Sequence, residues 1–110
     1  MSVEQDQLYA RLMEINSATF ATGSHEVAFH VLLAAFHRAK ELGATSLLLQ
    51  IEQRAREQLS WIDTYHDTHS LSSSCATSRG HTSIYGLLIK QSEIERQKVE
   101  WRHTYRSGLS

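Results

Sequence analysis

The chain contains no proline and only five glycines in 110 residues. Proline is the residue that most strongly breaks a helix, so its absence leaves every helical pattern in the sequence uninterrupted. Glycine then becomes the main signal for where helices end. Gly23 and Gly43 each follow an apolar helical pattern. A helix-start signal comes soon after each glycine, Ser24 in the first case and Thr45 or Ser46 in the second. The two glycines therefore predict three successive helices in the first two-thirds of the chain.

The chain has a single cysteine, Cys75, which cannot form an internal disulfide and so fits a reducing compartment. The sequence lacks a CxxC pair, a glycine-rich phosphate loop and a Gly-x-Ser-x-Gly motif. Cys75 lies in a serine-rich segment that offers no pre-organised base or oxyanion site, so it is a poor candidate nucleophile. No catalytic residue is therefore predicted, and an enzyme is the least expected class of protein.

Membrane and secretion signals are also missing from the sequence. The first residues, MSVEQDQL, show neither the basic region nor the apolar region of a signal peptide. No apolar run approaches the ~18 residues that a membrane span needs. We therefore expect a cytoplasmic location and no membrane partner.

No strong net charge is present, since the formal value is −1. Residues 1–67 carry nine acidic and five basic side chains, and residues 68–110 carry three acidic and six basic ones. The basic side chains of the last segment alternate with aromatic ones, as in some nucleic-acid binders. Three glutamates among them reduce the local charge, so a solvated helix face is favoured over nucleic-acid binding. The basic residues are Lys90, Arg96, Lys98, Arg102 and Arg106, and the glutamates are Glu93, Glu95 and Glu100.

What the sequence does contain is long amphipathic segments. Residues 3–21 place Leu8, Leu12 and Ile15 on one helical face. Residues 24–42 are apolar almost all the way round, which is typical of a central, buried helix. Residues 46–65 carry the one-sided apolar pattern of an outer helix. Because only short turns separate these segments, we expect neighbouring helices to be antiparallel.

The remaining segment differs in composition. Residues 67–82 are rich in Ser and Thr, which predicts a flexible loop. Residues 83–106 predict a fourth helix, in which Leu87, Ile94 and Trp101 recur every seven residues. The expected fold is therefore a single all-α domain, an antiparallel three- to four-helix bundle. Residues 1–66 form its three-helix core, and the long Ser/Thr-rich loop precedes a last helix that completes the bundle or a dimer.

Seven histidines are the one unusual feature of the composition. Glu26, His30, His37 and Glu41 form a polar seam on one side of the apolar second helix. His30 and His37 would lie roughly 10 Å apart along the helix axis, too far to bind one ion together. A partly exposed seam is therefore favoured over a metal or cofactor site.

A second histidine group follows the third helix. Asp63, His66 and His69 are spaced by three residues, and two imidazoles with a carboxylate could bind zinc, nickel or iron. Histidines near a helix C-terminus are also favoured simply by the helix dipole. No cofactor is expected unless this group binds a transition metal.

The favoured function is a small protein–protein interaction or regulatory module that associates with itself, most simply as a homodimer. The apolar surface of the second helix and of residues 84–89 exceeds what a small bundle can cover. Large side chains in these regions and in the last helix are the expected contact residues; they are Trp61, Leu88, Trp101 and Tyr105. The alternative is a helical bundle that binds a metal or small ligand through its clustered histidines.

Overall fold

The computed structural model describes residues 6–109, and the side chains of residues 6–104 among them. It is a compact all-α structure, as the sequence predicts. The helices are α1 (Gln7–Ala21), α2 (His25–Leu42), α3 (Thr45–Tyr65), α4 (Ser73–Ser78) and α5 (Ile84–Leu109). None of the helices within residues 6–109 is both long and apolar enough to cross a membrane.

The two turn glycines lie where the sequence places them. Gly23 and Gly43 have φ values of 85° and 59°, a left-handed conformation that glycine adopts without steric cost. Gly43 ends α2, and its N–H bonds the last carbonyls of that helix. At the start of α1, the Asp6 carboxylate accepts a 2.8 Å hydrogen bond from the Tyr9 N–H. The same carboxylate pairs with Arg38 of α2 at 2.7 Å, so this cap also ties α1 to α2.

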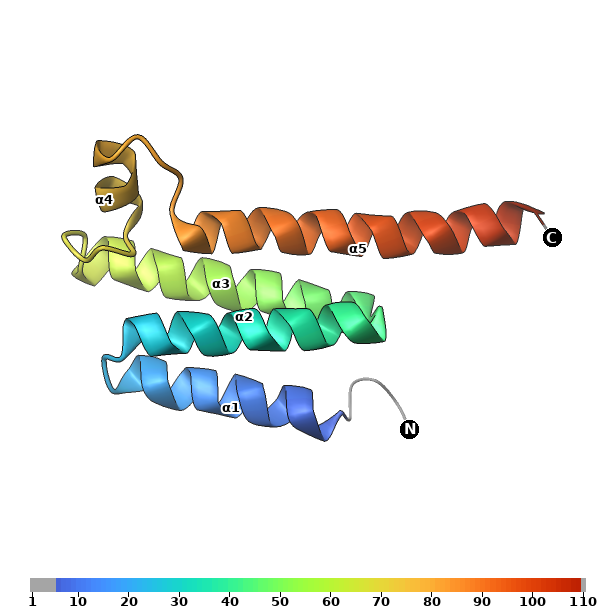
Figure 1. Ribbon diagram of the computed structural model, residues 1–110, viewed down its shortest axis with the longest axis horizontal. Helices are drawn as coiled ribbons and strands as arrows, with labels where there is room; N and C mark the ends of the chain where they lie inside the picture. Colours follow the sequence, from blue (N-terminus) through green and yellow to red (C-terminus); the bar gives the residue numbers. More distant parts are fainter. Residues whose placement is uncertain (1–5, 110) are drawn as a thin grey trace.

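The four long helices form two antiparallel pairs, α1 with α2 and α3 with α5, as Figure 1 shows. The pairs join where α2 packs on α3 and on the first half of α5. Phe29 of α2 contacts the ring of Tyr85 in α5, with 5.0 Å between ring centroids. Because α2 contacts α1, α3 and α5, it is the central helix that its apolar sequence predicts.

The core is mostly apolar, but a network of buried polar side chains runs through it. Gln58 of α3 donates a 2.7 Å hydrogen bond to Asn16 of α1 and accepts a 2.8 Å bond from the Tyr85 hydroxyl of α5. Asn16 also donates to the Ala28 carbonyl of α2 at 2.7 Å. Buried polar groups are costly unless they are paired. This network pairs them and links all four long helices.

The Ser/Thr-rich segment differs from the expectation of a loop without structure of its own. It contains α4, which begins after Ser72, whose hydroxyl accepts a hydrogen bond from the Cys75 N–H. The Asp63 carboxylate accepts hydrogen bonds from both the backbone and the hydroxyl of Ser73, at 2.8 and 2.7 Å. Leu71 is buried in the core. A helix of six residues is not stable alone, so these tertiary contacts explain why composition did not reveal it.

The last helix, α5, begins at Ile84 and runs antiparallel to α3, a direction that the long connection left open in the sequence. It is the longest helix, with 26 residues, against 18 in α2. Figure 1 shows its C-terminal end extending beyond the ends of α2 and α3. A large part of its surface is therefore not covered by the bundle.

Candidate functional site

The outward face of α5 carries four large apolar side chains. Ile84, Leu87, Ile94 and Trp101 are 38, 49, 48 and 65 % exposed. Leu87, Ile94 and Trp101 are seven residues apart, so each lies only about 20° from the one before it around the helix axis. Ile84, three residues before Leu87, lies about 60° to one side of Leu87. We call these four residues the outer stripe of α5. Such a row on a helix is normally covered by another helix.

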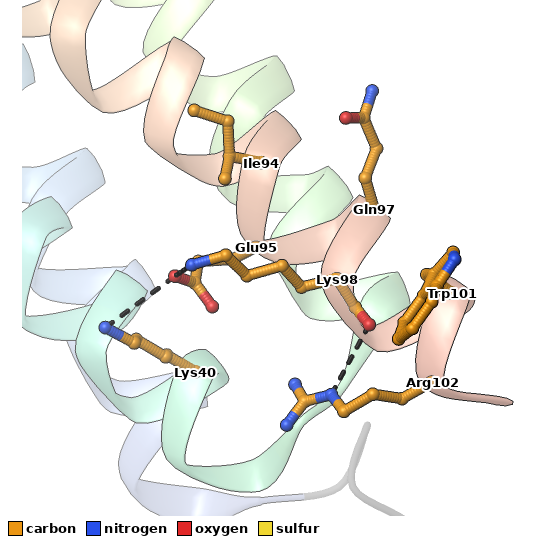
Figure 2. A pocket seen from close by; sticks show the side chains of 7 residues that line it. All are labelled: Lys40, Ile94, Glu95, Gln97, Lys98, Trp101 and Arg102. Atoms are coloured by element: carbon orange, nitrogen blue, oxygen red, sulfur yellow. Dashed lines mark hydrogen bonds and ion pairs between the residues drawn. The ribbon is translucent and has the colours of Figure 1, made fainter. Parts of the chain in front are cut away.

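A hollow of about 710 Å³ lies beside the C-terminal half of the stripe (Figure 2). Lys40 of α2 and Lys98 of α5 reach the same Glu95 carboxylate, at 3.8 and 3.5 Å. The Arg102 side chain turns back to donate a 3.3 Å hydrogen bond to the Lys98 carbonyl. The hollow is lined by Lys40, Ile94, Glu95, Gln97, Lys98, Trp101 and Arg102. It is thus an apolar surface bordered by three cations and one carboxylate.

A second pocket, of about 420 Å³, lies at the other end of the stripe, between the α4 segment and the start of α5. Leu71 and Ala76 supply apolar walls from the α4 segment, and Ile84 and Leu87 supply them from α5. Arg79 lies at this pocket and donates a 3.0 Å hydrogen bond to the Ser70 carbonyl. We call this the α4–α5 pocket.

A third feature is a cluster of rings at the end of the bundle that holds the α1–α2 turn. His25, the first residue of α2, is 6 % exposed. Its ring centroid lies 4.5 Å from Phe20, 5.3 Å from Trp61, 5.5 Å from His69 and 6.0 Å from His66. These five residues form the histidine–aromatic cluster. They come from α1, α2, α3 and the segment after α3.

The environment of His25 disfavours its charged form. Burial lowers its pKa below the ordinary value of 6.5, and the neighbouring His69 and His66 lower it further. Its Nδ1 atom is buried and has no hydrogen-bond partner among the described residues. The cluster therefore disfavours protonation of the His25 ring.

The proposed ligands Asp63, His66 and His69 are not brought together as a metal site. Asp63 uses both carboxylate oxygens to bind Ser73, and the His69 Nδ1 atom accepts a 3.1 Å hydrogen bond from the Leu71 N–H. His66 instead faces Trp61, with 5.1 Å between ring centroids. Within the part of the chain that the structure describes, no three His, Cys, Asp or Glu side chains are placed to hold a metal ion.

The polar seam of α2 lies on the surface. Glu26, His30, His37 and Glu41 are all exposed. His30 contacts the ring of Phe29, and His37 contacts the ring of Phe36, at centroid distances of 5.6 and 5.4 Å. The seam therefore faces outward, and its side chains do not converge on a common site.

The four expected contact residues differ in accessibility. Trp61 is 39 % exposed at the edge of the histidine–aromatic cluster, and Trp101 is 65 % exposed on α5. Leu88 is 1 % exposed and belongs to the core, so it is not part of the candidate surface. The side chain of Tyr105 lies outside the described residues.

Sequence reasoning did not select Ile84, Leu87 or Ile94 as contact residues, although the seven-residue spacing of Leu87, Ile94 and Trp101 indicated their shared face. It also did not select His25, because the partners of that ring come from distant parts of the chain. Gly23 and Ser24, which precede His25, indicated where a helix begins but nothing about the partners of the His25 ring.

In comparisons with protein-family models, curated proteins and solved structures, nothing matches this chain. Its function is therefore inferred from its own residues.

Proposed function

We propose that this chain is a protein–protein interaction module that associates with a second copy of itself through the outer stripe of α5, and that its role is regulatory rather than catalytic. The observation that carries the proposal is the exposure of four large apolar side chains in one row on one helix. Large apolar side chains that are exposed to solvent in this number mark protein interaction sites when they form a common surface.

The residue types on this surface support the proposal. Interface cores are enriched in aromatic residues and depleted of charged ones, with polar residues at the rim. Trp101 is the most exposed member of the stripe, and exposed tryptophans frequently contribute the largest share of binding energy. Lys40, Glu95 and Lys98 border the stripe at the adjoining hollow and form the polar rim. The stripe and its border therefore resemble the apolar core and the polar rim of a protein interface.

A second copy of the chain is the proposed partner because self-association is compatible with the charge of the molecule. The formal net charge is −1, so two copies repel each other little. The stripe also continues along more than four helical turns of α5, which provides a long contact for another helix.

Sedimentation velocity of the full chain over a range of concentrations tests this proposal. We expect the wild-type chain to sediment as a dimer and Ile94→Glu to sediment as a monomer, because the new carboxylate would be buried in the interface. Gln53→Glu is the matched control, since it adds the same charge at an exposed site on α3. A wild-type chain that stays monomeric, or an Ile94→Glu variant as dimeric as Gln53→Glu, would contradict the proposal.

A further inference from the structure

We infer that two copies dock with their α5 helices antiparallel, so that Trp101 of each copy enters the α4–α5 pocket of the other. This inference rests on the proposed self-association and specifies its geometry. It identifies the occupant of a pocket that no other part of the described chain fills.

The exposed Trp101 ring and the α4–α5 pocket lie at opposite ends of the same helix. Trp101 is at the C-terminal end of the outer stripe, and Ile84 and Leu87, which line the pocket, are at its N-terminal end. The 17 residues from Ile84 to Trp101 span about 25 Å at 1.5 Å per residue. One copy therefore cannot place its own Trp101 in its own pocket.

A two-fold axis between two copies would bring Trp101 of one copy to the pocket of the other. In a symmetric dimer, the same patch is used by both copies, and each contact occurs twice. When the two α5 helices are antiparallel, the C-terminal half of each one lies beside the N-terminal half of the other. Both tryptophans then reach both pockets at once, and Ile94 lies near the symmetry axis. All four residues of the stripe become covered in each copy.

The pocket has the walls that an indole ring requires. Its volume of about 420 Å³ falls within the roughly 300–1,000 Å³ of sites that hold small molecules. Leu71, Ala76, Ile84 and Leu87 provide apolar contact, and Arg79 provides a cation at the pocket. A guanidinium group over an indole face is favourable. Tryptophan is therefore a better occupant than an aliphatic side chain.

Engineered disulfides in the full chain test the docking geometry. In a Cys75→Ser background, we would introduce His81→Cys at the pocket and Thr104→Cys one turn beyond Trp101. Both positions are exposed. Within one copy, they are separated by about 30 Å along α5, and a disulfide requires Cα atoms within about 7 Å. An intramolecular bond between them is therefore excluded, and peptide mass spectrometry after mild oxidation identifies the pairs that form.

We expect a covalent dimer that contains the bond between positions 81 and 104. The control pair is His81→Cys with Lys90→Cys, which antiparallel docking keeps apart, so we expect no bond between positions 81 and 90. Only bonds between identical positions, or no bond in a sample that sediments as a dimer, would overturn the antiparallel geometry while leaving the self-association intact. A sample that sediments as a monomer would overturn both.

Discussion

Tyr85 on α5 donates a 2.8 Å hydrogen bond to the Gln58 side chain on α3, inside an otherwise apolar core. The Gln58 amide in turn donates to Asn16 on α1 at 2.7 Å. These bonds satisfy groups that burial would otherwise leave unpaired, and they join elements that are distant in the sequence. The network therefore fixes how the α3–α5 pair sits on the α1–α2 pair, and through it the position of the outer stripe.

Removing the centre of this network should destabilise the fold. Gln58→Leu would leave the buried Tyr85 hydroxyl and the Asn16 side chain with fewer partners, and an unpaired buried polar group costs about 1–3 kcal/mol. Tyr85→Phe removes a single hydroxyl and should cost only about 1 kcal/mol. Urea denaturation of each variant measures the free energy of unfolding. Equal stability of Gln58→Leu and the wild-type chain would contradict the role given to the network.

Leu87 and Leu88 are neighbours in the sequence with opposite environments. Leu88 is 1 % exposed, whereas Leu87 is 49 % exposed. Leu88→Ala should lower the free energy of unfolding by about 2–5 kcal/mol, as for other buried leucines. Leu87→Ala should change it little but weaken self-association. Thermal unfolding and sedimentation of both variants test this difference, and a Leu88→Ala variant that dissociates without losing stability would contradict it.

The buried His25 predicts that the fold weakens in mild acid. Its pKa is lowered below 6.5 by burial and then by His69 and His66, so the unfolded chain binds the proton more readily than the folded one. The contribution of His25 to stability is therefore complete above pH 6.5 and declines as the pH falls below it. Urea denaturation between pH 8 and pH 5 measures this dependence.

His25→Phe keeps an aromatic ring beside Phe20 and Trp61 but cannot bind a proton. This variant should lose much of the decline in stability between pH 8 and pH 5. His30→Phe is the control because His30 is exposed on the same helix, and it should keep the wild-type profile. A His25→Phe profile that follows the wild-type profile would show that His25 is not the responsible group.

A second effect of pH is expected at lower values, at Glu52. This buried carboxylate binds Arg56 at 3.1 Å and Arg96 at 3.2 Å. Burial raises its pKa, but hydrogen bonds with Arg56, then with Glu93 and then with Arg96, lower the pKa overall below the usual 4.5. The carboxylate therefore contributes stability above pH 4.5 that is lost as the pH falls through its folded pKa. Glu52→Gln should cost about 1–3 kcal/mol at pH 7 and much less at pH 3. A cost that is the same at both values would contradict this assignment.

The helices α1, α2 and α3 could be predicted from the sequence because their ends depend on local features, above all Gly23 and Gly43. The short helix α4 could not, since it is held by hydrogen bonds from Ser73 to Asp63 and by the burial of Leu71. Three of the four residues of the outer stripe could be recognised from the seven-residue spacing of Leu87, Ile94 and Trp101. Neighbouring residues point about 100° apart on a helix, so only one of Leu87 and Leu88 can face the core. Because both side chains are leucine, their identity did not show which of the two is buried.

The structure also places the candidate metal ligands in a way that local spacing did not indicate. Asp63, His66 and His69 are close in sequence, and this proximity indicated a ligand set. In the structure, Asp63 binds Ser73, and the histidines instead pack near His25, which follows a different turn. The packing of α2 against the end of α3 determines which of these side chains are in contact. The spacing of residues within one segment does not predict that packing.

The most direct test of the proposed self-association is the mass of the full chain in solution, measured by sedimentation equilibrium beside Ile94→Glu. We expect the wild-type chain to have twice its 12.5 kDa chain mass and Ile94→Glu to have the mass of a single chain. A wild-type mass of 12.5 kDa at every concentration would contradict the self-association of α5.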